Sequence, residues 1–319
     1  MNPALLSSAF GLDLLLGDPL WLPHPVRLMG RGIVRLETLL RRGFVPLIGE
    51  KLAGCLLLAT LVFFAFATTY FLIVIGTWMH PVLGTALILY FSYTCLASKS
   101  LGDAARGVSN ALSSASLPLA RRRLSHIVSR ETQDLSEKAV ICATVETVAE
   151  NTSDGIVAPL LYLALGGPAL AMAYKAVNTL DSMVGYRSPR YRDFGWASAK
   201  CDDWANYLPA RMTGFLMCIS ASLQSGRGLQ ALKIMRRDGE KHDSPNAGKA
   251  EAAMAGALGM QLGGPNFYKG VLKEKPWLGN AEKKPEIAQI QSSIRIMRST
   301  AMLMCFLTVA ILTFVRWSF

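Results

Sequence analysis

The sequence predicts an all-α, polytopic integral membrane protein with about four to six transmembrane or re-entrant helices and large cytoplasmic helical loops. Composition is the first observation behind this class. The 319 residues are 51% hydrophobic and only 17% charged, and the mean hydropathy of +0.31 is high for a soluble protein. The second observation is that residues 52–77 contain no charged side chain. A helix of this length can cross a hydrocarbon core of about 30 Å.

The apolar segments fall into strong and weak candidates for membrane spans. The strong candidates are residues 52–77, 82–97 and 300–315. The weaker ones are residues 1–16, 156–174 and 206–223, which carry charges, glycines or prolines. We expect broken or re-entrant helices in these weaker segments, all within a single membrane-embedded enzyme domain that covers residues 1–319.

The distribution of charge predicts the orientation. The net charge is +11, residues 225–299 contain 13 Lys and Arg, and the turn at 76–81 contains none. Because basic loops stay in the cytoplasm, the loops at 18–51, 98–155 and 225–299 are expected on that side. Clustered aromatics and nucleic-acid-binding motifs are absent from the sequence, so the positive charge does not predict a nucleic-acid partner. We expect the lipid bilayer to be the partner instead.

Three polar clusters lie between residues 138 and 211. In the first, Glu146, Glu150 and Asp154 are spaced four residues apart and share one side of a helix, if the helix reaches that far. Such like charges repel one another, so we expect a cation nearby that neutralises them. Two answers remain open: a salt bridge to Lys138, to Lys175 or to an arginine elsewhere, or a divalent metal that carries a phosphate. Ser136 is the expected N-cap, and 151–155 the expected C-terminal turn.

The second cluster places a cation, an amide and a carboxylate on one helix side, at Lys175, Asn178 and Asp181. This mixture suits the handling of phosphate or a Mg-nucleotide, and the alternative is an intrahelical Lys–Asp network. The arginines that follow, Arg187 and Arg190, could bind phosphate bidentately. The third cluster contains Asp202, Asp203, Asn206 and Arg211.

Two further segments carry polar motifs. Residues 244–249 form a Gly-containing turn before an Ala/Gly-rich helix expected from about 250 to 262, and backbone N–H groups at such a turn can bind phosphate. It is not a Walker A loop, because position 243 is Asp and position 250 is Ala. Near the N-terminus, His24 is either a structural or capping residue or a general base. It follows a turn that contains Asp18.

These motifs together resemble the adenosylcobinamide-phosphate synthase family of cobalamin (vitamin B12) biosynthesis. The resemblance runs through nearly the whole chain, in the order Asp13-Leu-Leu-Leu-Gly-Asp-Pro19, His24-Pro-Val-Arg27, Glu150-Asn-Thr-Ser-Asp-Gly155, Lys175-Ala-Val-Asn-Thr-Leu-Asp-Ser-Met-Val-Gly-Tyr186, Asp202-Asp203 with Asn206 and Pro209-Ala-Arg211, and Ser244-Pro-Asn-Ala-Gly248. It implies a bacterial cytoplasmic (inner) membrane protein whose active site lies on or near the cytoplasmic face.

The resemblance implies an ATP-dependent acid–amine ligase. The amine of (R)-1-aminopropan-2-ol phosphate, or of aminopropanol, is joined to the free propionate of adenosylcobyric acid, giving adenosylcobinamide phosphate. ATP and Mg²⁺ are the expected cofactors, because a carboxylate is a poor acyl donor until it is phosphorylated. Other late enzymes of the cobalamin pathway are expected partners. The alternatives are a Mg-dependent membrane transferase of the prenyl or CDP-alcohol type, whose DxxDGxxAR-type spacing is absent here, and a corrinoid transporter.

Residue chemistry then predicts the roles within the site. Glu146, Glu150 and Asp181 are the expected Mg²⁺ ligands. The expected catalytic residues are Glu150, Asp181, Lys175, Asp202 and Asp203, with Asp202 or Asp203 taking a proton from the attacking ammonium or orienting it. The expected substrate- or phosphate-binding residues are Asn151, Asp154, Asn178, Arg187, Arg190, Asn206, Arg211, Ser244, Asn246, Lys249, His24 and Asp18.

Overall fold

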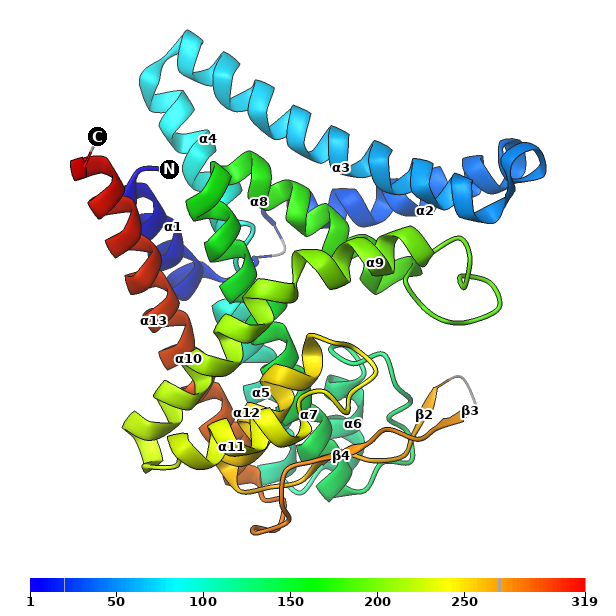
Figure 1. Cartoon of the computed structure of the whole chain (residues 1–319), viewed down its shortest axis with the longest axis vertical. Coiled ribbons are helices and arrows are strands. Elements are labelled where there is room, and N and C mark those ends of the chain that lie inside the picture. Colours follow the sequence, from blue (N-terminus) through cyan, green and yellow to red (C-terminus); the bar gives the residue numbers. More distant parts are fainter. Residues whose placement is uncertain (20, 269–270, 319) are drawn as a thin grey trace. The chain divides into compact units, whose positions relative to one another are not determined.

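The computed structural model describes residues 1–19, 21–268 and 271–318, and it is mainly helical (Figure 1). The helices are α1 (Pro3–Leu16), α2 (Pro25–Gly43), α3 (Val45–Met79), α4 (Pro81–Tyr93), α5 (Ser98–Ser113), α6 (Leu117–Leu124), α7 (Glu137–Thr152), the π-helix η1 (Ser153–Val157), α8 (Ala158–Val184), α9 (Trp196–Ala205), α10 (Tyr207–Ser225), α11 (Gly228–Asp238), α12 (Ala247–Leu258) and α13 (Ile287–Ser318).

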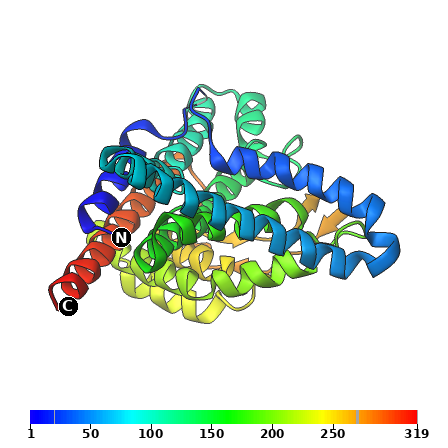
Figure 2. The ribbon, with the colours of Figure 1, turned by 90° about the horizontal axis from the view of Figure 1, so that it is seen from above.

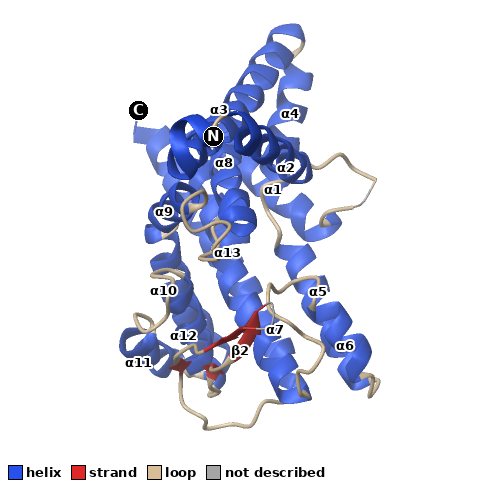
Figure 3. Cartoon of the chain, turned by 90° about the vertical axis from the view of Figure 1, so that its right-hand side faces the viewer, coloured by secondary structure: helices blue, strands red, loops and turns tan. Residues whose placement is uncertain are grey.

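The strands are short and confined to one stretch of the chain (Figure 3). They are β1 (Leu262–Gly263), β2 (Asn266–Tyr268), β3 (Val271–Lys273) and β4 (Trp277–Leu278). β1 pairs with β4 and β2 pairs with β3, both antiparallel. The predicted all-α class is therefore confirmed, apart from these two small ribbons between residues 262 and 278.

Within the described residues, four helical stretches are long and apolar enough to cross a membrane: Val45–Met79, Pro81–Ser113, Glu137–Val184 and Ile287–Ser318. They contain the predicted spans 52–77, 82–97 and 300–315, and also the weaker candidate 156–174. The candidate 206–223 falls largely on α10, which is not among the four, and the candidate 1–16 falls on the short apolar helix α1.

The chain divides into two compact units. Unit 1 comprises residues 1–97, 158–206 and 305–319, and unit 2 comprises residues 98–157 and 207–304. Whether the two units act as the single enzyme domain expected from the sequence stays a prediction.

Unit 1 is built on α3, which packs against α2, α4, α8 and α9. α3 and α4 form a hairpin (Figure 1), and α2 runs beside α3 (Figure 2). α2 is amphipathic, because Met29, Ile33 and Leu40 are buried while its first three arginines are exposed. α8 is broken where expected, since Gly167 has a φ of +67° and Pro168 follows it.

Unit 2 surrounds α12, which packs against α7, α10 and α11. Every residue of α12 is buried, and its composition of Ala and Gly explains how neighbouring helices approach so closely. At Gly256 an added Cβ would lie 2.7 Å from the Cα of Ala231 on α11. The predicted Ala/Gly-rich helix is therefore confirmed, and its small residues permit this close packing. The helix begins and ends earlier than predicted, because Gly259 closes it in the left-handed conformation.

One expected boundary is wrong. The sequence predicts that the helix bearing Glu150 ends in a turn at 151–155, but the chain stays helical and widens there into η1. Short π segments inserted between α-helices occur often at functional sites. The predicted binding residue Asp154 lies within this π segment.

Candidate functional site

Helix α7 supplies the two glutamates of the first polar cluster. Its N-terminus is capped as predicted, because the Ser136 hydroxyl accepts a hydrogen bond from the Ala139 N–H at 3.3 Å. Glu146 and Glu150 lie one helical turn apart, but their surroundings differ: Glu146 is buried, whereas Glu150 is exposed. Of these two carboxylates, Glu146 is therefore internal and Glu150 is accessible to solvent.

Arg130 is the cation that pairs with Glu146. An Arg130 guanidinium nitrogen donates to Oε2 of Glu146, and the Gly263 N–H donates to Oε1 at 2.7 Å. Arg130 also donates to Oδ1 of Asn266 at 3.0 Å. The side chain of Glu146 is 4% exposed and that of Arg130 is 9% exposed, so the pair is buried and both carboxylate oxygens are satisfied. For Glu146 the salt-bridge alternative is confirmed.

A second buried carboxylate, Glu251, lies on α12 opposite a histidine. The side chain of Glu251 is 4% exposed and that of His242 is 8% exposed, and His242 Nε2 lies 3.9 Å from Glu251 Oε1. His242 Nδ1 accepts a hydrogen bond from the Ser244 N–H at 3.0 Å. The proton of the neutral ring therefore resides on Nε2, which has no hydrogen-bond partner among the described residues.

Burial controls the charge of both groups. Burial, together with the Glu146 and Glu150 carboxylates, holds the pKa of Glu251 well above its usual range, and Lys275 and Arg130 act in the opposite direction. Burial and the nearby Lys275 lower the pKa of His242 to about 4. We call this group of six side chains in unit 2 the Glu251 cluster: Arg130, Glu146, Glu150, His242, Glu251 and Lys275.

The predicted phosphate-binding turn leads into α12. The Ser244 hydroxyl accepts hydrogen bonds from the N–H groups of Asn246 and Ala247, at 3.3 and 3.2 Å, and so closes the turn that precedes the helix. Lys249 forms an ion pair with Glu240 at 3.0 Å, and Arg211 donates to Asn246 Oδ1 at 3.4 Å. The structure thus places Arg211, Asn246 and Lys249 in one unit. Their binding of a phosphate stays a prediction.

Unit 1 contains a different polar group, which joins α8 to α9. Asn178 donates to Oδ1 of Asp202 at 3.3 Å, and the Tyr174 hydroxyl donates to Oδ1 of Asn206 at 2.9 Å. The ring of Tyr162 stacks on that of Tyr174, with centroids 4.7 Å apart. We call Tyr174, Asn178, Asp202 and Asn206 the Asp202 cluster. The structure therefore brings together predicted residues from the second and third motifs.

Asp202 has the environment of a proton acceptor. Burial raises the pKa of its carboxyl to about 6, against the lowering effect of the Asn206 and Asn178 amides and of the Lys175 charge. A carboxylate that titrates near neutrality can both hold and release a proton at working pH. Its neighbour Asp203 instead lies 3.6 Å from Lys200 in an i,i+3 ion pair.

Asp181, on the last turn of α8, lies close to Gly185. The Gly185 N–H donates to the backbone oxygen of Asp181 at 2.8 Å, and a Cβ at Gly185 would lie 1.9 Å from Oδ1 of Asp181. Only glycine fits there. Asp181 lies in unit 1, whereas Glu146 and Glu150 lie in unit 2, so a metal site shared by the three stays a prediction. In the described parts of either unit, no group of three or more His, Cys, Asp or Glu side chains is placed to hold a metal.

The N-terminal motif, with Asp18 and His24, forms a turn that is held by side-chain hydrogen bonds. His24 Nε2 lies 3.1 Å from Oδ1 of Asp18, and the His24 side chain does not cap α2. Two tyrosines of α4 hold this turn: Tyr93 donates to the Gly17 carbonyl, and Tyr90 donates to the Pro23 carbonyl at 2.6 Å. His24 thus stands at the N-cap position of α2 without a side-chain capping hydrogen bond, and its structural and general-base roles stay predictions.

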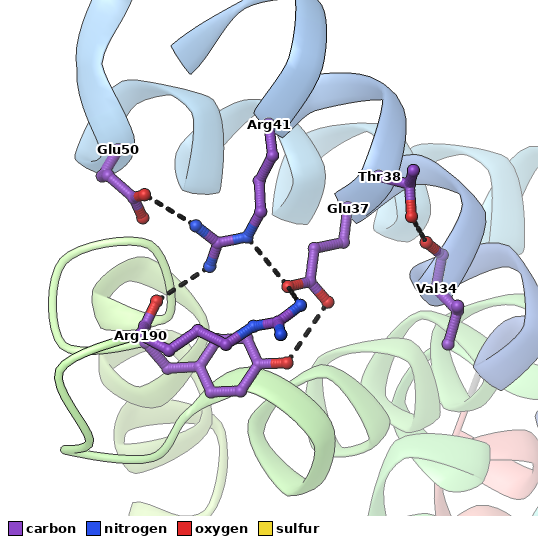
Figure 4. Close-up of polar contacts among 7 residues, drawn as sticks. Val34, Glu37, Thr38, Arg41, Glu50 and Arg190 are labelled. Carbon is purple, nitrogen blue, oxygen red and sulfur yellow. Dashed lines mark hydrogen bonds and ion pairs between the residues drawn. The ribbon is translucent and has the colours of Figure 1, made fainter.

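Arg190 is held in a network that the sequence did not suggest (Figure 4). It donates to Oε1 of Glu37 on α2 at 3.0 Å, while Arg41 donates to the same oxygen at 2.9 Å. Arg41 also reaches Glu50 at 2.6 Å and the backbone oxygen of Arg190 at 2.8 Å. Arg190 thus ties its loop to α2, while Arg187 is exposed. Phosphate binding by either arginine stays a prediction.

Sequence reasoning missed Arg130, His242, Glu251 and Lys275. One signal was present: apart from Lys249, Glu251 is the only charged residue in a helix of small and apolar residues, where a buried charge needs a partner. The other three residues lie in loops, where the sequence carries no periodicity to indicate burial. Their convergence depends on the packing of α12 against α7.

Comparison with known proteins gives a consistent result. The model of the CobD/CbiB protein family matches residues 6–297. The cobalamin biosynthesis protein CobD of Geobacter metallireducens is 47% identical over 310 residues, which cover 97% of this chain and 96% of that protein. CobD of Pelobacter propionicus is 45% identical over 315 residues, covering 99% and 97%. CbiB of Salmonella typhimurium, also named a cobalamin biosynthesis protein, is 44% identical over 292 residues, covering 91% of each chain. No solved structure matches.

Proposed function

Because the chain belongs to the CobD/CbiB family of cobalamin biosynthesis proteins, we propose that it is an ATP-dependent ligase that makes cobinamide phosphate. The substrates would be adenosylcobyric acid and (R)-1-aminopropan-2-ol phosphate or free aminopropanol. The new bond is an amide between the amine and the free propionate. The observation that supports this chemistry most directly is Asp202, a carboxylate whose pKa of about 6 suits proton transfer near neutral pH.

The proposed reaction has two steps. The propionate oxygen first attacks the γ-phosphorus of ATP, which forms an acyl phosphate and releases ADP. The amine nitrogen then attacks the acyl carbon, so that the C–N bond forms, the C–O bond to phosphate breaks and inorganic phosphate leaves. The amine must lose a proton to become nucleophilic. Asp202, or Asp203 beside it, would accept that proton or orient the amine, and Asn178 would hold the Asp202 carboxylate in place.

The cations of the predicted site suit the phosphoryl transfer. Lys175, Arg187 and Arg211 would neutralise charge that develops on the transferring group. Arg211 is held in place by its own bond to the Tyr207 carbonyl at 2.7 Å and by stacking over the Tyr207 ring at 3.4 Å. A pre-positioned guanidinium stabilises transition-state charge without further ordering.

The donor set is compatible with Mg²⁺ that arrives with ATP. Magnesium in nucleotide sites is usually held by one or two carboxylates together with phosphates and water, rather than by a protein cage. Glu150 is an exposed carboxylate of this kind, whereas both oxygens of Glu146 already accept hydrogen bonds. When bound, the metal would neutralise phosphate charge. We propose Glu150 in unit 2 and, separately, Asp181 in unit 1 as carboxylate ligands of this kind.

We also propose that the protein resides in the bacterial cytoplasmic membrane with its site near the cytoplasmic face, where other late enzymes of the pathway could deliver or take its corrinoid. The four apolar helical stretches support residence in a membrane.

The test is amide formation by Glu150→Gln, Asp181→Asn and Asp202→Asn variants in detergent, each shown to be folded. Asp193→Asn is the matched control, since Asp193 is an exposed aspartate of unit 1. We expect all three variants to lose most of their activity and the control to retain it. Near-normal activity in all three would refute the assignment. Mg-dependent transfer of a diphosphate-linked group, or transport of corrinoid without ATP-dependent consumption, would instead support a membrane transferase or a transporter.

A further inference from the structure

A second cavity, of about 560 Å³, lies in unit 2, and its lining includes no residue of the Glu251 cluster. Its walls are the ends of α10 and α12, the loop before α13 and the first turns of α13. The Lys283 N–H donates to the Gly259 carbonyl at 2.8 Å, and the side-chain amide of Gln224 donates to Ser299 Oγ at 2.8 Å. Hydrogen bonds within one unit therefore hold the walls together. Four of the lining side chains are cationic: Arg227, Lys283, Arg295 and Arg298.

The charges of these four cations are only partly neutralised. Arg227 forms an ion pair with Glu282 at 2.6 Å. Among the described residues, no carboxylate lies within ion-pair distance of Lys283, Arg295 or Arg298. Like charges that converge on one cavity repel one another. The cavity therefore offers a favourable place for an anion.

The hydrogen-bond donors of the cavity suit a phosphate group. Arg298 is half-buried and makes no hydrogen bond to the described residues, so its planar guanidinium can bind two phosphate oxygens at once. The neighbouring Ser299 hydroxyl accepts from Gln224 and still has its own O–H to donate. Arg295 is oriented by a hydrogen bond to the Ser292 hydroxyl at 2.9 Å. These donors line one wall of the cavity, along α13.

The position of the cavity along α13 indicates where the phosphate comes from. Arg295 and Arg298 lie in the two turns before the predicted span 300–315, which belongs to the stretch Ile287–Ser318 that is long and apolar enough to cross a membrane. Helical spacing places Met302 on the same side as both arginines, and Met302 lines the cavity while 54% exposed. Cations just outside an apolar span lie at the depth of lipid headgroups.

We propose that this cavity binds the phosphate of an anionic phospholipid headgroup. Lys283, Arg295 and Arg298 donate to the phosphate oxygens, and the acyl chains leave the cavity past Met302 toward the apolar part of α13. A soluble phosphate compound offers the same oxygens to the cations, but it gains nothing from apolar contact at Met302. The proposal goes beyond the ligase reaction and does not depend on it.

The test is lipid binding by the full chain in non-ionic detergent, measured by native mass spectrometry. The protein is titrated with phosphatidylglycerol and, separately, with phosphatidylcholine that has the same acyl chains. We expect tighter binding of phosphatidylglycerol, because the unpaired cations favour a net negative headgroup. Arg298→Gln and Lys283→Gln should each weaken phosphatidylglycerol binding by about fivefold, and the double variant by about 25-fold.

The matched control is Arg236→Gln, because Arg236 is an exposed arginine of unit 2 on α11 and does not line the cavity. It should bind phosphatidylglycerol as the parent does. Replacement of Lys283 or Arg298 removes no side-chain hydrogen bond to the described residues, so both variants should fold, which gel filtration and tryptophan fluorescence check.

Three outcomes would overturn the proposal. The first is equal binding of the two lipids by the parent. The second is an equal loss of phosphatidylglycerol binding in Arg236→Gln and Arg298→Gln, which would show attraction to basic surface in general. The third comes from a parallel titration with inorganic phosphate and ATP: if Arg298→Gln weakens their binding but leaves that of phosphatidylglycerol unchanged, the cavity holds a soluble phosphate compound instead.

Discussion

Replacement of Arg130 tests the buried core of the Glu251 cluster. Arg130→Met removes the cation paired with Glu146 and also the hydrogen bond to Asn266 Oδ1 at 3.0 Å. Within the described residues, Glu146, whose side chain is 4% exposed, would then keep the Gly263 N–H as its donor. Loss of one partner from a buried ion pair costs about 3–5 kcal/mol of unfolding free energy. We expect a loss in this range.

The compensating variant makes the reasoning testable. Glu146→Gln in the Arg130→Met background removes the stranded charge but keeps an amide oxygen for the Gly263 N–H. Only ordinary hydrogen bonds are then lost, at about 1 kcal/mol each, so the double variant should be more stable than Arg130→Met alone by about 2 kcal/mol.

The assay is denaturant unfolding in detergent, followed by tryptophan fluorescence, with Arg122→Met as the control because Arg122 is exposed on α6. Arg122→Met should leave the unfolding midpoint unchanged. A loss of less than about 1 kcal/mol in Arg130→Met, or no recovery in the double variant, would refute the view that Arg130 neutralises a buried Glu146.

Three further predictions follow from named carboxylates and the histidine. Asp202→Asn should lower the rate of amide formation by about 10²–10⁴, and the parent rate should fall as pH drops below about 6, where Asp202 is protonated. Because the folded pKa of Asp202 lies above its unfolded value, its stabilising contribution is present at low pH and lost as pH rises through about 6. The asparagine variant should therefore gain stability over the parent at pH 8 but not at pH 4; an equal difference at both pH values would contradict this. His242, with a folded pKa of about 4 below its unfolded value, should make the protein less stable as pH falls from about 6.5 toward 4, by up to about 3 kcal/mol, and His242→Gln should flatten that part of a stability–pH curve. Asp238→Asn should cost about 2–4 kcal/mol in the same unfolding assay, because the buried Asp238 carboxylate accepts from Arg237, Lys241 and the Gly279 N–H; a loss below 1 kcal/mol would show that these contacts contribute little.

The helical membrane class could be predicted because its signals are local. The run at 52–77 has no charged residue, and Gly166-Gly167-Pro168 breaks the apolar helix α8. Each signal can be recognised from consecutive residues of the sequence. The sequence predicts that the motifs containing Asn178 and Asp202 belong to one site. It does not predict their hydrogen bond, because the two residues lie on different helices. The short strands were missed because two- and three-residue ribbons leave no period to detect.

The Glu251 cluster could not be predicted from the sequence because it depends on tertiary packing. Arg130 and Lys275 lie in loops of ordinary basic composition, and a charge run usually indicates a solvated surface. His242 precedes Ser244 by two residues, and its fixed tautomer arises only when the turn closes and the Ser244 N–H donates to Nδ1. Helical spacing related Glu146 to Glu150, but it could not reveal that one is buried and the other exposed.

The most direct test of the ligase proposal uses isotopically labelled substrate. The purified protein in detergent would be supplied with Mg-ATP, aminopropanol phosphate and adenosylcobyric acid whose free propionate carries ¹⁸O in both oxygens. The proposed mechanism predicts ATP-dependent formation of adenosylcobinamide phosphate and transfer of one ¹⁸O to the released inorganic phosphate, both detected by mass spectrometry. Amide formation without ATP, or phosphate that contains no ¹⁸O, would contradict activation of the propionate as an acyl phosphate.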